Sequence, residues 1–362
     1  ANASIGNNEL TLNGSSNTVY ALQNLYSSGL YNGKTLQFTY EIISNTLVGG
    51  GDFRGGGITG GSLFPSANLA LNSTVGTHTV DIVINSTGIN SALDIFITAP
   101  YTSGSLVIDN VSVKEVGQDW TVTGSDSTHY VEFLSTGARF VSDTTSPVLE
   151  LKQNAITSGK QYKLTCNIAY TGVGQLRVNV GTNLTPFTEG ANTKYFTATS
   201  STMSFLRENA NVDCLISNVS VKEVGQDWSY NGATIGDDKA NIIGDGSAFT
   251  NISQSGVFTS GKQYKVTVDV TINSGLGLKF QDGANNENIG FATTSGSYTF
   301  YFSSTSNTTL VIGRRTGGTA FNSSVDNVSV KEVGQDWTFG NGWGMGDDKA
   351  NYDATVTGTE LR

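Results

Sequence analysis

The sequence contains few of the residues that hold metal ions or carry out nucleophilic catalysis. Its 362 residues include two cysteines, Cys166 and Cys214, and two histidines, His78 and His129. A structural zinc site usually takes about four Cys or His ligands, and a Ser-His-Asp site needs a buried carboxylate to orient the imidazole. No segment of the sequence indicates either arrangement. We therefore expect no zinc site and no enzymatic activity, and we expect both histidines at the surface or at a sheet edge.

Charged residues are also scarce. They make up 14% of the chain, against about 25% in an average soluble protein, which excludes coiled coils and charged helical bundles. The net charge of -10 and the absence of a basic patch predict that phosphate backbones are repelled, so we expect no nucleic-acid partner. No apolar run approaches the roughly 18 residues of a membrane helix, so we expect no membrane insertion.

What the sequence does contain is a long internal repeat. The string Asn-Val-Ser-Val-Lys-Glu-Val-Gly-Gln-Asp-Trp begins at Asn110, Asn218 and Asn327, which lie 108 and 109 residues apart. Solenoid repeats are about 20 to 50 residues long, so each unit here is a domain. We predict domains at 1–116, 117–224 and 225–333. Residues 334–362 are predicted to be a linker and the first strands of a truncated fourth domain, so that the chain is a segment of a longer repeat protein.

Each unit shows a hydrophobic period of two. Apolar residues alternate with polar ones along 36–42, 162–168 and 264–272, and β-branched and aromatic residues are frequent. No stretch has a helical period with caps. The predicted fold class is all-β, with tandem antiparallel β-sandwiches arranged as beads on a string.

Paired acidic residues occur at Asp237–Asp238 and again at Asp347–Asp348. Neighbouring residues of a strand point to opposite faces, and the aligned positions of the first unit are Asn7 and Asn8, which transfer no proton. We interpret these pairs as polar turns between early strands.

The order of motifs resembles a known family. A Gly-Lys-x-Tyr strand comes first, then an aromatic strand such as 298–302, and then a closing Asp-Asn-Val-Ser-Val at 109–113 and 326–330. This order resembles jelly-roll domains of the carbohydrate-binding-module type. The closing Asn-Val-Ser-Val-Lys-Glu-Val motif looks like tandem copies of that fold in phage tail fibres and other virion appendages.

The resemblance implies a metal site without any other cofactor. In the sugar-binding modules a calcium ion often lies near the closing strand and is held partly by its Asp. Asp109 and Asp326 match that position, whereas the second unit has Ser217 there. The alternative interpretation is that these Asp residues only terminate a strand or cap a turn.

Four cations are candidate ligand-binding residues. Arg207 aligns with Arg314, and Arg177 occupies a place similar to that of Lys279. A recurrent cation on a weakly charged surface can bind a hydroxyl group or an acidic sugar. The alternative is a solvated strand-end residue whose stem covers the core. The first unit has Ile97 in place of the arginine.

Two further features concern the architecture. Trp120, Trp228 and Trp337 each start a new unit, and a large aromatic residue there is predicted to set the inter-domain junction; the alternative is recent duplication. Cys166 and Cys214 either form a disulfide or remain buried free thiols. The thiols are the favoured interpretation because neither sister unit has cysteines there.

Together these patterns give a hypothesis of function. The resemblance implies a non-enzymatic structural or adhesive component of a phage virion fibre, located on the virion or outside the cell. Its expected partners are further copies of itself or other virion proteins, together with host-surface glycans. One alternative is a set of accessory sugar-binding modules in a secreted bacterial enzyme or adhesin. The other is a self-assembling extracellular fibre that binds no glycan.

Overall fold

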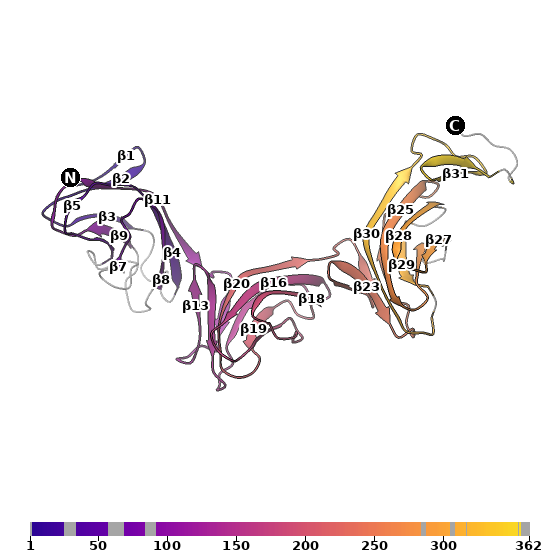
Figure 1. Cartoon of the computed structure of the whole chain (residues 1–362), viewed down its shortest axis with the longest axis horizontal. Coiled ribbons are helices and arrows are strands. Elements are labelled where there is room, and N and C mark those ends of the chain that lie inside the picture. Colours follow the sequence, from indigo (N-terminus) through magenta and orange to yellow (C-terminus); the bar gives the residue numbers. More distant parts are fainter. Residues whose placement is uncertain are drawn as a thin grey trace. The chain divides into compact units, whose positions relative to one another are not determined.

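The computed structural model describes residues 2–24, 34–56, 69–83, 92–283, 287–304, 308–315, 317–353 and 355. Every regular element among these residues is a β-strand (Figure 1), and each strand pair with a described register is antiparallel. The predicted all-β class is confirmed. No helix in the described part of the chain is long and apolar enough to cross a membrane.

The first group of strands lies within residues 3–116. Its larger sheet has the order β1-β2-β11-β4-β8, its second sheet the order β3-β9-β6-β7, and β5 pairs with β10. The bounds are β1 (Ala3–Gly6), β2 (Glu9–Asn13), β3 (Val19–Asn24), β4 (Thr35–Asn45), β5 (Val48–Gly49), β6 (Phe53–Gly55), β7 (Leu69–Ala70), β8 (Gly76–Val83), β9 (Ala92–Ile97), β10 (Tyr101–Ser103) and β11 (Ser105–Val116).

The second group lies within residues 121–223 and repeats this plan. Its sheets have the orders β13-β14-β20-β16-β18 and β12-β15-β19-β17. The bounds are β12 (Thr121–Thr123), β13 (His129–Leu134), β14 (Gly137–Ser142), β15 (Glu150–Gln153), β16 (Gln161–Tyr170), β17 (Leu176–Asn179), β18 (Gly190–Thr197), β19 (Met203–Arg207) and β20 (Val212–Glu223).

The third group, within residues 229–333, has the same two sheets, and a hairpin follows it. The sheet orders are β22-β23-β30-β25-β28 and β21-β24-β29-β26-β27. The bounds are β21 (Ser229–Asn231), β22 (Thr234–Gly236), β23 (Lys239–Gly244), β24 (Asn251–Gln254), β25 (Gln263–Ser274), β26 (Leu278–Asp282), β27 (Glu287–Ala292), β28 (Gly296–Ser303), β29 (Leu310–Arg314) and β30 (Phe321–Val333), followed by the hairpin strands β31 (Trp343–Gly346) and β32 (Lys349–Tyr352).

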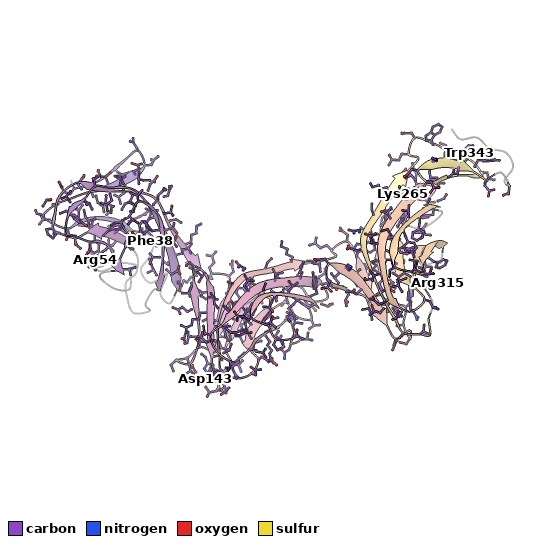
Figure 2. All side chains as sticks on the ribbon, viewed as in Figure 1. Phe38, Arg54, Asp143, Lys265, Arg315 and Trp343 are labelled. Carbon is purple, nitrogen blue, oxygen red and sulfur yellow. The ribbon has the colours of Figure 1, made fainter. Side chains whose placement is uncertain are left out.

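In the first and third groups one core joins both sheets. In the first group, Phe38 of β4 packs in one cluster with Ile95 of β9, and Figure 2 labels Phe38. In the third group, Val268 of β25 and Phe280 of β26 share a cluster in the same way. Apolar side chains on the inner faces of two antiparallel sheets define a sandwich. The predicted tandem jelly-roll class is confirmed, because the closing strand lies at the centre of its sheet in each group.

Contacts between residues divide the chain into two compact units. The first comprises Ala1–Asn154, Cys166–Asn192 and Thr202–Val219, and the second comprises Ala155–Thr165, Thr193–Ser201 and Ser220–Arg362. One end of the second sandwich therefore groups with the residues that follow it. The predicted boundaries at 116, 224 and 333 stay predictions.

The repeated closing motif forms a β-bulge. On β11, Asn110 and Val111 lie between the paired residues Asp109 and Ser112, and β30 has the same irregularity around Asn327. Asn110 and Asn327 have φ of 50° and 51°, a left-handed conformation that Asn tolerates better than most residues. Their amides also donate to carboxylates, to Glu41 at 2.6 Å and to Asp269 at 2.8 Å. The motif thus needs Asn for backbone and side-chain reasons.

Candidate functional site

One strand position carries a cation in all three sandwiches. Arg54, Arg177 and Lys279 lie opposite Phe96, Leu206 and Gly313 on the neighbouring strand of the same sheet. In β17 and β26 the flanking residues are buried in the core, so Arg177 and Lys279 point to the outer face. The predicted equivalence of Arg177 and Lys279 therefore agrees with the strand register. Arg54, which Figure 2 labels, is a third member that sequence alignment missed.

Arg207 and Arg314 occupy a second equivalent position, on the other face of the same sheets. They lie opposite the core residues Leu176 and Leu278. Arg314 donates to the carbonyl of Gly246, and its guanidinium lies 5.9 Å from the ring centroid of Phe321. The four predicted cations consequently do not form one site, because strand alternation directs them to opposite faces.

The outer face of the third sandwich combines cations with exposed rings. The Nζ atom of Lys279 lies 4.7 Å from the ring centroid of Phe249, and the Arg315 guanidinium lies 5.0 Å from that of Phe291. Lys279 and Phe291 are direct cross-strand partners, so they share a face. Phe249 and Phe291 are 37% and 42% exposed. We call Phe249, Lys279, Phe291 and Arg315 the aromatic–cation face; Figure 2 labels Arg315.

Local structure fixes the position of these groups. The carbonyl of Phe249 accepts hydrogen bonds from the side-chain amides of Asn231 at 2.9 Å and Asn251 at 3.3 Å. A Cβ atom at Gly313 would lie 2.7 Å from the Phe249 ring, so only glycine leaves room for the ring on the sheet. Burial, with a smaller effect from Arg314, lowers the pKa of Lys279. Lys279 and Arg315 form no ion pair among the described residues.

The equivalent face of the second sandwich is electrostatically neutralised. Arg177 donates to Glu208 at 2.8 Å, and Lys152 lies 3.2 Å from Glu150. A polar hollow of about 470 Å³ on this face is lined by Glu150, Lys152 and Ser204, among other residues. No aromatic side chain lines it. This face therefore lacks the stacking surface present in the third sandwich.

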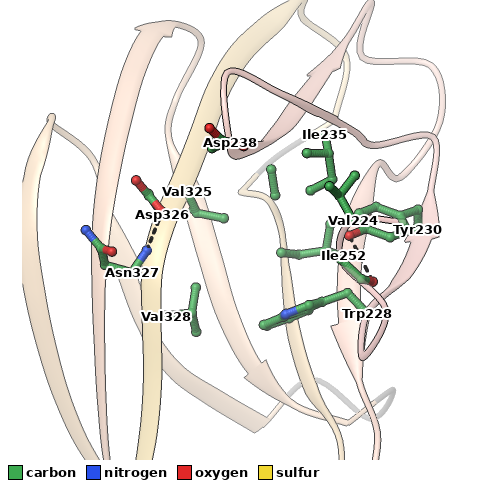
Figure 3. A pocket seen from close by; sticks show the side chains of 12 residues that line it. Val224, Trp228, Tyr230, Ile235, Asp238, Ile252, Val325, Asp326, Asn327 and Val328 are labelled. Atoms are coloured by element: carbon green, nitrogen blue, oxygen red, sulfur yellow. Dashed lines mark hydrogen bonds between the residues drawn. The ribbon is translucent and has the colours of Figure 1, made fainter. Parts of the chain in front are cut away.

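Trp120 and Trp228 each cover one end of the sandwich that follows them. Trp228 and Tyr230 line a cavity of about 330 Å³ together with Ile252 and Val325, as Figure 3 shows. Trp120 lines a similar cavity of about 320 Å³, where its ring lies 5.8 Å from that of Phe205. The backbone amides of Trp120, Trp228 and Trp337 each donate to a glycine carbonyl three residues earlier at 3.0 Å. That these residues set the orientation of neighbouring domains stays a prediction.

Asp109 and Asp326 lie beside the bulge of the closing strand. Asp109 is paired with Glu41 and Asp326 with Asp269. In both places the Asn of the closing motif donates a hydrogen bond to the carboxylate of the paired residue, which is Glu41 or Asp269. The described residues contain no group of three or more Asp, Glu, His or Cys side chains that could hold a metal ion. Calcium binding by these two carboxylates stays a prediction.

Two sequence expectations concern single side chains. Cys166 and Cys214 are buried free thiols, which agrees with the favoured interpretation, and burial raises the pKa of Cys214 to about 12.

His129 does lie on an edge strand, β13, but its side chain is fully buried and not at the surface. Its Nδ1 lies 2.8 Å from Asp126 and its Nε2 lies 3.2 Å from Asp143.

Comparisons with known proteins do not assign a function to this chain. No family model matches the chain, and no curated protein matches it. Among solved structures, the chain is similar to the N-terminal CBM22-1-CBM22-2 tandem domain from Paenibacillus barcinonensis Xyn10C. The two are 9% identical, with a TM-score of 0.22, over 60% of this chain and 94% of the other.

Proposed function

We propose that this chain is a non-enzymatic adhesive component that binds glycans on the aromatic–cation face of its third sandwich. One observation carries the proposal: two exposed phenylalanine rings, each beside a cation without an acidic partner, lie on one sheet face. A structural role does not require such an arrangement, since exposed aromatic rings add nothing to the core.

The chemistry of this face suits a sugar. The apolar C–H face of a pyranose ring stacks on an aromatic side chain, and the ammonium and guanidinium groups donate hydrogen bonds to hydroxyl or carboxylate oxygens. Arg315 offers a planar fork that matches a carboxylate, whereas Lys279 is a point charge. In a chain of net charge -10, two cations without acidic partners favour an acidic glycan.

The biological setting that we propose is a phage virion fibre or appendage. The tandem sandwiches and their closing motif support this setting through the resemblance described above. Host-surface glycans would then be the ligands, and copies of the chain or other virion proteins would be the assembly partners. The accessory modules of a secreted enzyme or adhesin would use the same face, whereas a purely self-assembling fibre would not need it.

A glycan array with neutral and acidic sugars, followed by titration calorimetry, tests the proposal. We expect Phe249→Ala and Phe291→Ala each to weaken binding about tenfold or more, because truncating an aromatic anchor commonly costs over 1.4 kcal/mol. Lys279→Gln should weaken acidic glycans more than neutral ones. Arg177→Gln is the matched control, since Arg177 occupies the same strand position and is paired with Glu208; it should leave affinity unchanged.

Two results would overturn the proposal. One is the absence of binding to every glycan on the array, which would leave the self-assembling fibre as the better hypothesis. The other is a glycan whose affinity is insensitive to Phe249→Ala and Phe291→Ala, which would place the sugar site elsewhere in the chain.

A further inference from the structure

The acidic pairs noted in the sequence form tight turns of left-handed conformation. Asp237 and Asp238 connect β22 to β23 with φ of 53° and 59°, and Asp347 and Asp348 connect β31 to β32 with φ of 49° and 57°. Two successive residues of positive φ characterise the type I′ hairpin turn, where Asn and Asp are favoured. The interpretation of these pairs as polar turns is thus confirmed.

The second residue of the turn is held by the preceding sandwich. Lys163 Nζ lies 2.9 and 2.7 Å from the two carboxylate oxygens of Asp238. The same Nζ lies 5.4 Å from the centroid of the Tyr195 ring, and Tyr195 also hydrogen-bonds Asp238. All three residues belong to the second compact unit, which explains why segments 155–165 and 193–201 group with the residues that follow them.

The same arrangement recurs one repeat later. Lys265 Nζ lies 2.8 Å from both carboxylate oxygens of Asp348, and 5.6 Å from the centroid of the Tyr301 ring. The Tyr301 hydroxyl donates to Asp348 at 2.9 Å and accepts from the backbone amide of Asp348 at 3.0 Å. Lys265, labelled in Figure 2, and Tyr301 are cross-strand partners on β25 and β28. We call each such pair, Lys163 with Tyr195 and Lys265 with Tyr301, a Lys–Tyr clamp.

The first sandwich has the opposite polarity at this position. Gln37 and Asp81 are the cross-strand partners there, on β4 and β8. The turn that follows, between β13 and β14, carries the uncharged residues Ser135 and Thr136. Asp81 accepts a hydrogen bond from the backbone amide of Ser135 at 2.6 Å. At this junction the preceding sandwich has no clamp lysine. It carries the carboxylate itself, as Asp81, and the turn that follows is uncharged.

We propose that the Lys–Tyr clamp is a recognition site for an acidic left-handed turn, and that it determines which repeat is accepted as the next neighbour. A sandwich with the clamp binds a repeat whose hairpin turn, between β22 and β23 or between β31 and β32, is Asp-Asp. A sandwich with Gln37 and Asp81 accepts a neutral turn and repels an acidic one. Charge complementarity thereby determines whether a sandwich docks the hairpin of the repeat that follows it, independently of any glycan bound on the aromatic–cation face.

The structure supports recognition by the clamp over a nonspecific surface ion pair. Asp347 and Asp237, each the first residue of its turn, form no ion pair or hydrogen bond with the clamp among the described residues: the clamp lysines pair with Asp348 and Asp238 instead, although all four Asp residues adopt the same conformation. The clamp contacts one carboxylate with a cation and a phenol together, and in the third sandwich also the backbone amide of the turn. Such multiple contacts give a geometric preference that a single lysine would not give.

Hydrogen exchange of the hairpin β31–β32 in the full chain tests the proposal. We expect Asp348→Asn and Lys265→Gln to raise its amide exchange about two- to fivefold, the range given by exposed ion pairs. Asp347→Asn is the matched control, because Asn keeps the left-handed turn and Asp347 does not touch the clamp; its exchange should equal that of the unaltered chain. Equal effects of Asp347→Asn and Asp348→Asn, or no effect of either, would overturn the proposal.

Specificity is tested at the first junction. We expect Ser135→Asp, which places a carboxylate next to Asp81, to raise the exchange of β13 amides, while Ser135→Asn does not. Adding Asp81→Asn to Ser135→Asp should restore the original rate. If Ser135→Asp behaves like Ser135→Asn, charge does not determine the neighbour and the proposal fails.

Discussion

At the residue scale, the identical eleven-residue string reflects several separate local requirements. Its asparagine adopts the left-handed conformation of the bulge and bonds a carboxylate on the neighbouring strand. Its glycine also has positive φ, and in the first two copies its tryptophan covers the following sandwich. Few residue types satisfy any of these conditions, which explains physically why these positions keep the same residue while the bodies of the repeats differ.

Gly225 gives a test of this explanation. Its φ is +63°, and a Cβ atom there would collide with the hydroxyl group of Tyr230. We expect Gly225→Ala to lower the free energy of unfolding by roughly 1 to 3 kcal/mol, because strain and a steric clash add. Gly256 has φ of +73° with open space around it, so Gly256→Ala should cost about 1 kcal/mol from strain alone. Urea unfolding measures the free energy of unfolding of both variants. Equal losses in Gly225→Ala and Gly256→Ala would show that contact with Tyr230 does not require glycine at position 225.

At the element scale, edge strands are fixed by polar contacts at their ends. His129 starts β13 and joins Asp126, in the preceding loop, to Asp143 and the carbonyl of Thr145, in the loop after β14. The hydrogen bond to Asp126 raises the pKa of His129, and His129 in turn lowers the pKa of Asp126 to about 2. The strand end is therefore held by an imidazole between two carboxylates, and the hydrogen bond to Asp126 favours its protonated form.

This contact predicts a pH dependence of stability. Because the pKa of His129 is raised in the folded state, its stabilising contribution is complete below the unfolded pKa of about 6.5 and is lost as the pH rises through the folded value. We expect the thermal midpoint to fall as the pH rises from about 6.5 through the folded pKa, and His129→Gln to remove most of this dependence. His78, which has no carboxylate partner among the described residues, provides the control: His78→Gln should behave like the unaltered chain.

At the scale of the whole molecule, the chain comprises more than one compact unit. Units with separate cores unfold as separate cooperative transitions unless their interface couples them. Phe38 belongs to the core of the first sandwich and Phe280 to that of the third, and both are fully buried. The stability of this protein is consequently not described by one free energy of unfolding.

Calorimetry with two core variants checks this expectation. Phe38→Ala and Phe280→Ala should each cost about 3 to 5 kcal/mol, the usual cost of deleting a buried phenylalanine. Each variant should lower the midpoint of a different transition and leave the other in place, since distant sites are additive. A single transition that shifts with either variant would show instead that the units unfold together.

The repeat, the strands and the turns follow from the amino-acid sequence alone. Period-two patterns such as 36–42 and 264–272 require one buried face, and Asn and Asp pairs favour left-handed turns, so β4, β25 and the Asp237–Asp238 turn follow from local rules. The free, buried state of Cys166 and Cys214 also agrees with the sequence argument from the sister repeats. These are short-range properties, which a single chain segment already contains.

Which side chains lie in contact depends on the tertiary structure. Phe249 and Phe291 are far apart in the sequence, and they share a face with Lys279 because β24, β29, β26 and β27 are neighbours in a sheet whose order differs from the chain order. The same pairing put Arg207 and Arg314 on the opposite face from Arg177 and Lys279, although the sequence offered all four as candidate ligand-binding residues. The Lys–Tyr clamp likewise joins residues about 75 or more positions apart, Lys163 to Asp238 and Lys265 to Asp348. The physical reason is that hydrogen-bonded register, and not sequence distance, sets which outward side chains of a β-sandwich lie within contact.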